Sequence, residues 1–416
     1  MEDKKKLKIL LVPSNYGGCT QHRMVLPFKK IEEQMGDEVE IRWNENPLGY
    51  NNETKEFKYF NIEEQPYEGP IPDIDWADVV FTNNISNFGG PYTLEVLRQT
   101  RTRGKLAHWD TDDLLTDIYH GHRLKDTYVN NGLEEMAKHM YAIANLVSVT
   151  QERFAERIAP YALANDGKIV TIRNCLDLKD PNWNMPKAPA PKNLCRFGWV
   201  GGIHHDVDVK QIDGVFHTVN QKVGVERVFW GLYGRPNINT DDKDNQWQLD
   251  VWKGYEAYLA RSIRSKRKNY NIYPALPTDR YGQFFTNIDV AIAPLEDNAF
   301  NDSKSSIKAI EAGAYKVPLV ATNIGDYDTI IKHNHNGILI PRDNPKTAWI
   351  KQLSRLAKDK KMREELGQNL YDTIKDQFDL NKVACQRINV YKSMLGWEEN
   401  EFTKDLRKTE DSDSNE

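Results

Sequence analysis

The residues best suited to chemistry stand together in the stretch NDSKSSIKAIE, which ends at Glu311. Asp302 and Ser303 both have the side chain of a helix N-cap, and we expect a helix to begin at one of them. Because a helix turns every 3.6 residues, Lys304, Lys308 and Glu311 fall on one face of it. The sequence therefore predicts two ammonium groups and a carboxylate aligned along one helix face.

The start of this predicted helix has the composition of a diphosphate site. Lys304, Ser305 and the backbone N–H groups of the first turn all suit a bound anion. Two turns further on, Glu311 is placed to accept hydrogen bonds from ribose hydroxyl groups. The spacing also fits an ordinary solvated face with a Lys308–Glu311 ion pair, so the motif alone leaves both interpretations open.

A glycine turn follows a predicted strand in each half of the chain. The first is NYGG, which contains Gly17 and Gly18, and the second is WVGG, which contains Gly201 and Gly202. Glycine lets the backbone approach an anion closely, and a following helix offers its N–H groups. Neither turn has the GxGxxG pattern of dinucleotide sites, and a plain strand-to-helix turn explains NYGG equally well.

The second glycine turn continues into a pair of histidines, His204 and His205. Their ring nitrogens add hydrogen-bond donors for a phosphate or sugar oxygen. No third ligand is spaced near them as a zinc site requires. The pair therefore favours anion or sugar binding at this turn over metal binding.

Short apolar runs alternate with amphipathic helical segments, which is the pattern of βαβ units and parallel sheets. The predicted strands of the first half are Lys8–Val12, Val39–Trp43, Asp78–Thr82, Lys105–Trp109, Leu146–Thr150 and Lys168–Arg173. Those of the second half are Cys195–Val200, Val225–Gly231, Asn271–Tyr273, Asp289–Ala293, Pro318–Ala321 and Gly337–Ile340. Since open parallel sheets bind ligands outside the carboxyl ends of their strands, we expect a binding cleft between the two halves.

A proline-rich stretch, DPNWNMPKAPAPKN, divides the chain. We predict a Rossmann-like domain over 1–180, a linker over 181–193 and a second Rossmann-like domain over 194–379. A helix within 380–400 is expected to pack back on the first domain, and the charged residues 401–416 to be disordered. The length of 416 residues agrees with two domains, because single cores seldom exceed about 300 residues.

The composition, with 39% hydrophobic and 28% charged residues, is that of a globular enzyme, and no apolar run is long enough for a transmembrane helix. The net charge of −5 gives no general attraction to nucleic acid, although the basic run RSIRSKRK at 261–268 leaves a nucleic-acid contact open. Four widely spaced cysteines without a CxxC pattern favour a reducing compartment, so we expect a cytoplasmic location.

The second half resembles the donor-binding region of family-4-like (group 1) glycosyltransferases of the GT-B fold. The resemblance rests on EAG from Glu311, VPLVA from Val317 and GILI from Gly337. FGWVGGIHHDVD is similar to a variant of the family's phosphate loop, with His205 and Asp208 matching. IRNCLDL resembles the stretch that precedes the interdomain linker in this family.

One departure concerns the two glutamates that the family spaces as E-x7-E. The first would stand at Ser303 in this chain, and in the family it often handles the donor sugar. A related subset has N…K-S-x-x-K-x-x-E instead, and this chain fits it with Asn301, Lys304-Ser305, Lys308 and Glu311. We take the subset as the better match.

The resemblance implies an α/β protein of GT-B fold, with two Rossmann-like, doubly wound domains facing across a cleft. It implies a retaining transfer from a nucleoside diphosphate sugar, which serves as co-substrate, with no bound metal and no other cofactor. The predicted donor-binding residues are Gly17, Gly18, Gly201, Gly202, His204, His205, Lys304, Ser305, Lys308 and Glu311.

The first half would hold the acceptor. A glycan, a lipid-linked glycan, a protein, a small molecule and a hydroxymethylated DNA base of a phage all remain open as acceptors, as does the oligomeric state. His108 and Asp110, in HWDTDD at the end of a predicted strand, are the candidate catalytic residues that orient or deprotonate the acceptor hydroxyl. Asp112 and Asp113 fit a helix N-cap equally well.

Two other classes of function share these features. A nucleotide-sugar epimerase of GT-B fold would need no acceptor and would cluster carboxylates and a histidine in the cleft. A non-catalytic sugar-nucleotide-binding protein would bind the donor without turnover. Donor hydrolysis measured with and without candidate acceptors separates the three.

Overall fold

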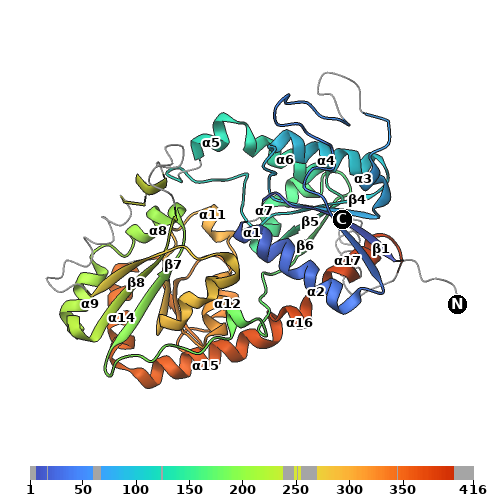
Figure 1. Ribbon diagram of the computed structural model, residues 1–416. Coiled ribbons are helices and arrows are strands. Elements are labelled where there is room, and N and C mark those ends of the chain that lie inside the picture. Colours follow the sequence, from blue (N-terminus) through green and yellow to red (C-terminus); the bar gives the residue numbers. More distant parts are fainter. Residues whose placement is uncertain are drawn as a thin grey trace, which may run out of the picture. The chain divides into compact units, whose positions relative to one another are not determined.

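The computed structural model describes residues 6–15, 17–59, 67–122, 125–237, 248–250, 252–253, 269–343 and 345–397. The chain forms two compact units (Figure 1). Unit 1 comprises Met1–Ile118, Asp126–Asn174 and Leu380–Glu416, and unit 2 comprises Tyr119–Lys125 and Cys175–Asp379. The basic run at 261–268 and the predicted disordered tail at 401–416 lie outside the described residues.

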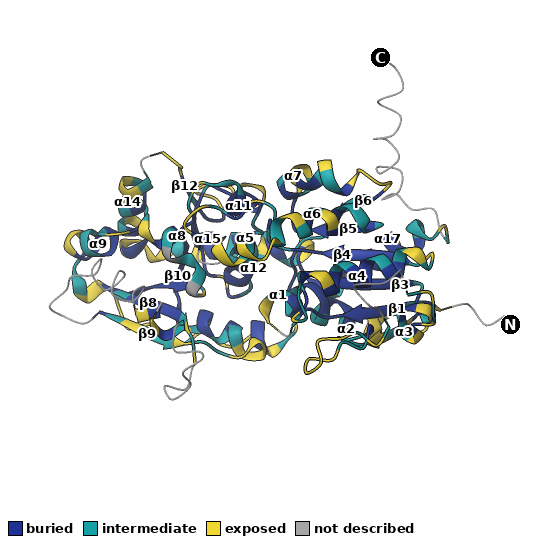
Figure 2. Cartoon of the chain, turned by 90° about the horizontal axis from the view of Figure 1, so that it is seen from above, coloured by how far each residue is buried: buried dark blue, intermediate teal, exposed yellow. Residues whose placement is uncertain are grey.

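Unit 1 contains a parallel sheet of six strands in the order β2-β1-β3-β4-β5-β6. The strands are β1 Leu7–Val12, β2 Val39–Trp43, β3 Val79–Asn83, β4 Leu106–Asp110, β5 Leu146–Val149 and β6 Lys168–Thr171. β3, β4 and β5 are buried along their whole length, as parallel strands covered on both faces must be (Figure 2). Each strand predicted for this half is present.

The helices of unit 1 fill the connections between these strands. They are α1 Gly18–Thr20, the π-helical turn Gln21–Val25, α2 Leu26–Met35, α3 Pro72–Trp76, α4 Gly90–Thr102, α5 Lys125–Asn130, α6 Leu133–Ile143, α7 Glu152–Ala162, α16 Leu380–Val383 and α17 Gln386–Met394. α4 packs on α6, and α6 packs on α7. α7 begins after Gln151, whose side-chain oxygen accepts a hydrogen bond from the Arg153 backbone N–H and so caps the helix.

Unit 2 repeats the architecture with a parallel sheet in the order β12-β11-β10-β7-β8-β9. The strands are β7 Cys195–Val200, β8 Val228–Arg235, β9 Tyr270–Pro274, β10 Val290–Ala293, β11 Leu319–Thr322 and β12 Ile338–Ile340. β8 begins later than predicted, because Val225–Arg227 forms a 3₁₀ turn before it. Two doubly wound parallel sheets confirm the predicted α/β fold class.

The helical segments of unit 2 are the 3₁₀ turns Pro181–Trp183, Ile203–His205 and Thr278–Asn287, and the helices α8 Asp206–Lys210, α9 Val215–Val223, α11 Ala299–Asp302, α12 Ile307–Ala314, α13 Tyr327–Ile330, α14 Pro345–Lys358 and α15 Lys360–Gln377. Their apolar sides form one core with the sheet. In it the rings of Phe216 and Trp230 stack with centroids 3.8 Å apart. Among the described helices, none is both long enough and apolar enough to cross a membrane.

The proline-rich stretch differs from the predicted separate linker at 181–193. The chain joins unit 2 at Cys175 rather than at 194. Trp183 is buried, the side-chain oxygen of Asn182 accepts a hydrogen bond from the Gly282 backbone N–H, and the Tyr315 hydroxyl donates to the Asn182 carbonyl. Packing of these side chains, which proline spacing does not reveal, makes the stretch part of unit 2.

The end of the described chain returns to unit 1, where α17, coloured red, lies beside elements near the N-terminus (Figure 1). Arg387 donates a hydrogen bond to the Arg23 carbonyl, and Lys392 forms an ion pair with Glu38 at 2.7 Å. The predicted single helix at 380–400 is two shorter helices, α16 and α17, within the described residues.

The helix predicted to begin at Asp302 or Ser303 also differs in the structure. α11 ends at Asp302 and α12 begins at Ile307, so residues 303–306 form a connection between them. The Ser306 hydroxyl donates to the Asp326 carboxylate at 2.9 Å, and Gly325 lies against the carbonyl of Lys304. Lys304 and Ser305 therefore stand on a loop, and the prediction that Lys304 shares a helix face with Lys308 and Glu311 is wrong.

Candidate functional site

Three connections of unit 2 begin at the carboxyl ends of neighbouring strands. They follow β7, β10 and β11, which lie side by side in the sheet. The carboxyl edge of an open parallel sheet is where such folds bind ligands. Most of the residues predicted to bind a donor stand on the first two of these connections.

Asp208 on α8 joins two of the connections. It is 1% exposed, and its Oδ1 accepts hydrogen bonds from the Glu296 backbone N–H and from the Asn301 side-chain amide, both at 2.8 Å. Its Oδ2 lies 2.7 Å from Nδ1 of His205. Because one buried carboxylate holds all three groups, His205 has a fixed orientation beside the glycine turn.

The glycine turn after β7 is shaped by a close backbone approach. The Gly201 backbone N–H donates to the Tyr233 carbonyl at 3.1 Å. Gly234 has a φ of +115°, and a Cβ there would lie 2.2 Å from the Gly201 carbonyl oxygen. Gly202 is exposed, with open space at its Cβ position, so the backbone at this turn is accessible to a ligand.

Rings gather around Phe300 of α11, close to this turn. The Lys304 ammonium lies 4.5 Å from the centre of the Phe300 ring. The His122 ring lies 5.2 Å from Phe300 and 5.8 Å from the His204 ring, measured between centroids. Lys304 and the histidine of the glycine turn thus belong to one cluster of donors at the carboxyl edge.

Lys308 and Glu311 form an ion pair at 2.9 Å, but not on a solvated face. Glu311 is 2% exposed, and the Lys308 ammonium also donates to the Tyr281 hydroxyl. Burial raises the pKa of the Glu311 carboxyl, and Lys308 opposes this shift. A carboxylate has about four lone-pair positions, so the ion pair leaves Glu311 the capacity to accept ligand hydroxyl groups.

The structure brings most of the predicted donor residues into one unit and leaves two in the other. Unit 2 holds Gly201, Gly202, His204, His205, Lys304, Ser305, Lys308 and Glu311. Unit 1 holds Gly17 and Gly18, at the start of α1 after β1. The Gly17 backbone N–H donates to the Asn15 side chain at 2.7 Å, which is the local hydrogen bond of a tight turn.

His108 and Asp110 of β4 are in the core of unit 1, and both are 0% exposed. The Arg23 guanidinium donates to both Asp110 oxygens, at 2.9 and 2.6 Å, and the Ser148 hydroxyl donates to the same carboxylate. His108 bonds to the Tyr391 hydroxyl and to Ser148, each at 2.8 Å. Both side chains are thus buried and held by partners in the core of unit 1, and the catalytic role predicted for them stays a prediction.

The protonation states in this network follow from its burial. Burial lowers the pKa of His108 to about 3, so the ring is neutral at physiological pH. Burial alone would raise the pKa of Asp110, but the Arg23 guanidinium outweighs it and holds the pKa below the ordinary value. The network is therefore a neutral imidazole beside a buried ion pair, which ties β4 and β5 to α17.

Sequence reasoning missed several residues of the unit 2 cluster. Tyr119, His122 and Phe300 carry no motif, and Tyr281 lies on an irregular 3₁₀ segment. Asp208 appears in the phosphate-loop pattern, but its spacing does not reveal that it also holds Asn301. A histidine in the YHGH sequence is the only local signal that could have drawn attention to 119–122.

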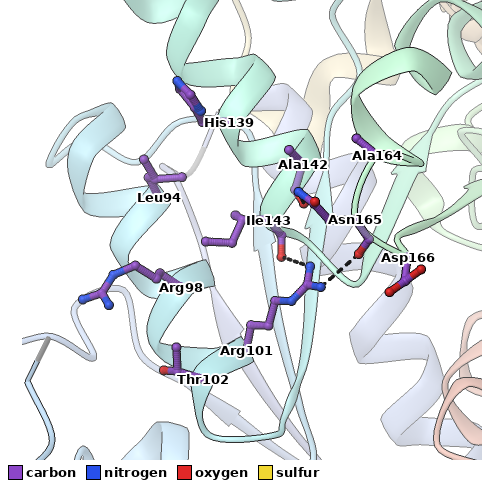
Figure 3. A pocket seen from close by; sticks show the side chains of 10 residues that line it. All are labelled: Leu94, Arg98, Arg101, Thr102, His139, Ala142, Ile143, Ala164, Asn165 and Asp166. Carbon is purple, nitrogen blue, oxygen red and sulfur yellow. Dashed lines mark hydrogen bonds between the residues drawn. The ribbon is translucent and has the colours of Figure 1, made fainter.

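A hollow of about 970 Å³ lies on unit 1. Its lining comes from α4, α6 and the segment after α7, and Figure 3 shows Arg101 donating hydrogen bonds to the carbonyls of Ile143 and Asn165. α4, α6 and α7 end here just before β4, β5 and β6 begin, so the hollow adjoins the amino ends of the strands. That is the edge opposite to the one where such sheets bind ligands.

Residues 253–373 match the sequence model of the glycosyl transferases group 1 family. An uncharacterised glycosyltransferase of Methanocaldococcus jannaschii is 30% identical over 115 residues, which make up 27% of this chain and 28% of that protein. The matched segment spans roughly a quarter to a third of the curated relatives it resembles. The predicted resemblance to group 1 is confirmed for this part of the chain.

Solved structures of GT-B glycosyltransferases share the fold over nearly the whole chain. Sucrose-phosphate synthase from Thermosynechococcus elongatus has a TM-score of 0.63 and 11% identity, covering 94% of this chain and 100% of that one. Anabaena HepE, in complex with UDP and glucose, has a TM-score of 0.57 and 13% identity, covering 94% and 100%. This chain has the GT-B fold, as its sequence predicts.

Proposed function

We propose that this protein, with its GT-B fold and its group 1 segment, transfers a sugar from a nucleoside diphosphate sugar to an acceptor hydroxyl. One observation carries the proposal: Asp208 fixes His205 and Asn301 at the carboxyl edge of unit 2, beside an accessible glycine turn and next to Lys304. Hydrogen-bond donors and a cation at one sheet edge suit a diphosphate. The transferases named among the relatives support the same reading over an epimerase.

The roles of the residues in this proposal follow from their chemistry. Lys304, the backbone at Gly201 and Gly202, and the histidines His204 and His205 hold the diphosphate. They stabilise the negative charge that grows on it as the bond to the sugar breaks. Ser305, on the same loop as Lys304, adds a hydroxyl donor to the phosphate oxygens.

Glu311 accepts hydrogen bonds from the ribose hydroxyl groups in this proposal. Lys308 keeps that carboxylate charged and fixed through their ion pair. A charged acceptor binds hydroxyl groups more strongly than a neutral one. The pair thereby places the nucleoside so that its diphosphate extends toward Lys304.

We further propose a retaining transfer that needs no bound metal and no cofactor besides the donor. The lysine and the N–H donors supply the positive charge that a metal ion supplies in other transferases. Activity is then expected to persist in EDTA. Loss of turnover in the chelator, restored by Mn²⁺, would contradict this part of the proposal.

Unit 1 would contribute the acceptor side, while Gly17 and Gly18, which follow its strand β1, stay predicted donor-binding residues. The chemistry of the described residues selects no acceptor among a glycan, a lipid-linked glycan, a protein, a small molecule and a modified DNA base. A screen of purified acceptors with labelled donor addresses this directly. A cytoplasmic location stays a prediction from the cysteine spacing.

Donor binding is tested by melting the protein with saturating UDP, GDP, ADP or dTDP. A ligand that binds the native state at about 100 times its Kd stabilises it by roughly 2.7 kcal/mol, which raises Tm by several degrees. We expect at least one of the four to do so. No shift with any of them would contradict a nucleotide-dependent function.

A further inference from the structure

A short segment from the first half of the sequence is built into unit 2. Tyr119 and His122 come directly after residues of unit 1, yet they pack on α11 of unit 2. The Tyr119 ring lies 5.9 Å from Phe300, and the His122 ring lies 5.2 Å from Tyr119, measured between centroids. His122 is 9% exposed. The chain thus places a histidine from outside the group 1 segment next to the glycine turn.

His122 stacks on His204 of that turn. Their centroids are 5.8 Å apart and their planes differ by 20°, which is a parallel arrangement. A neutral imidazole has one N–H donor, and a protonated one has two. Lys304 brings an ammonium to the same Phe300 ring, at 4.5 Å. His122 and Lys304 lie against the Phe300 ring and His204 stacks on His122, so the three form one cluster of hydrogen-bond donors.

Two carboxylates, Asp208 and Asp302, stand on the same two connections. Asp208 accepts from Asn301 and from the Glu296 backbone, and lies 2.7 Å from His205. Asp302 forms an ion pair with Arg342 at 2.9 Å. A lysine ammonium only donates hydrogen bonds and an imidazole carries at least one N–H donor, so these three groups together suit an anion rich in acceptor oxygens.

We propose that His122 is a donor-site residue that hydrogen-bonds the diphosphate together with His204 and Lys304. The inference rests on the proposed function and extends it, since it gives the segment Tyr119–His122 a part in recognising the donor. A hydrogen bond to a charged group corresponds to a loss of roughly 10-fold or more in affinity when it is removed. The loss should appear for the diphosphate and not for the nucleoside.

The test is a calorimetric titration of the full chain with the best-bound of UDP, GDP, ADP and dTDP, and with the matching nucleoside. His122→Phe keeps a ring against Phe300 and His204 but removes the ring nitrogens. It is expected to bind the diphosphate about 10-fold or more weakly and the nucleoside with unchanged affinity. His122→Gln, which retains a donor, is expected to bind the diphosphate with an affinity between those of wild type and His122→Phe. His120→Gln, an exposed position in the same segment, is the matched control and should bind as wild type does.

The outcomes separate this inference from the proposed function. Unchanged diphosphate affinity in both His122 variants would overturn the inference and leave the proposed function standing. An equal loss of affinity for the diphosphate and the nucleoside would assign His122 a packing role and would also overturn the inference. Wild-type protein that binds none of the four diphosphates would overturn both. If His122→Phe does not fold, His122→Gln gives the same comparison.

Discussion

The carboxyl edges of the two sheets differ in whether a buried carboxylate holds only core side chains or also orients exposed groups. In unit 1, Asp110 at the end of β4 accepts hydrogen bonds from Arg23 and Ser148 and has no exposed surface. In unit 2, Asp208 is equally buried, but the His205 it holds is partly exposed and Gly202 beside it is accessible. The same topology thus carries a closed structural network in one unit and a set of accessible donors in the other.

A polar residue at a strand end is therefore not by itself evidence of a site. The decisive feature is whether its partners leave a group exposed to a ligand. Asp110 uses its lone pairs within the core, whereas Asp208 uses its own to orient other groups at the sheet edge.

Asp110→Ala is expected to cause the largest effect, a loss of about 3–5 kcal/mol in the free energy of unfolding. It leaves the Arg23 guanidinium, 1% exposed, without its carboxylate in the core. Urea denaturation measures the loss, and kinetics at low temperature measure turnover per folded molecule, which should stay near wild type. Normal stability together with abolished turnover would instead support the predicted catalytic role of Asp110.

Glu311→Ala is expected to cost roughly 2–4 kcal/mol of stability, because it leaves Lys308 partly buried without its ion-pair partner. Nucleoside binding should weaken as well. The control is Asp372→Ala, which breaks an exposed pair with Lys375 and should change stability by less than about 1 kcal/mol. Equal stability of the two variants would contradict a buried Lys308–Glu311 pair.

Lys304→Ala is expected to leave stability within about 0.5 kcal/mol of wild type and to lower kcat/KM by ~10- to 100-fold. The reason is that Lys304 stands on a loop and its charge would act on the leaving diphosphate. Steady-state kinetics with saturating acceptor measure the effect. Lys332→Ala, exposed and outside the cluster, is the control, and wild-type kinetics in both variants would place the donor elsewhere.

The pH dependence of stability tests the neutral state of His108. Its folded pKa, about 3, lies below its unfolded value near 6.5, so the unfolded chain takes up a proton first as pH falls. Stability is complete above pH ~6.5 and falls by up to ~1.4 kcal/mol per pH unit below it, toward pH ~3. His108→Gln should flatten this slope between pH 6.5 and 5 in urea denaturation. An unchanged slope would contradict a buried, neutral His108.

The fold was predictable because buried parallel strands are apolar along their length. β10, for example, reads VAIA and lies within the strand predicted over Asp289–Ala293. The predicted helix start at Asp302 failed because Gly325 and Asp326, which follow a later strand, hold the chain at 303–306. No local pattern contains that information.

Part of the candidate site was predictable from local sequence patterns. Gly201, His205 and Lys304 belong to local motifs that mark the carboxyl edge of a sheet. The burial of Asp110 depends on Arg23, which is 87 residues away, and that of His108 on Tyr391, which is 283 residues away. Such partners follow from tertiary packing, as does the position of His122 beside His204.

Hydrogen exchange measured with and without the best-stabilising nucleoside diphosphate tests whether the diphosphate binds at the carboxyl edge of unit 2. We expect slower amide exchange on binding in peptides that cover 201–210 and 296–311, with little change at 106–113. Protection confined to 106–113 and the turn at Gly17 and Gly18, with none at 201–210, would contradict it.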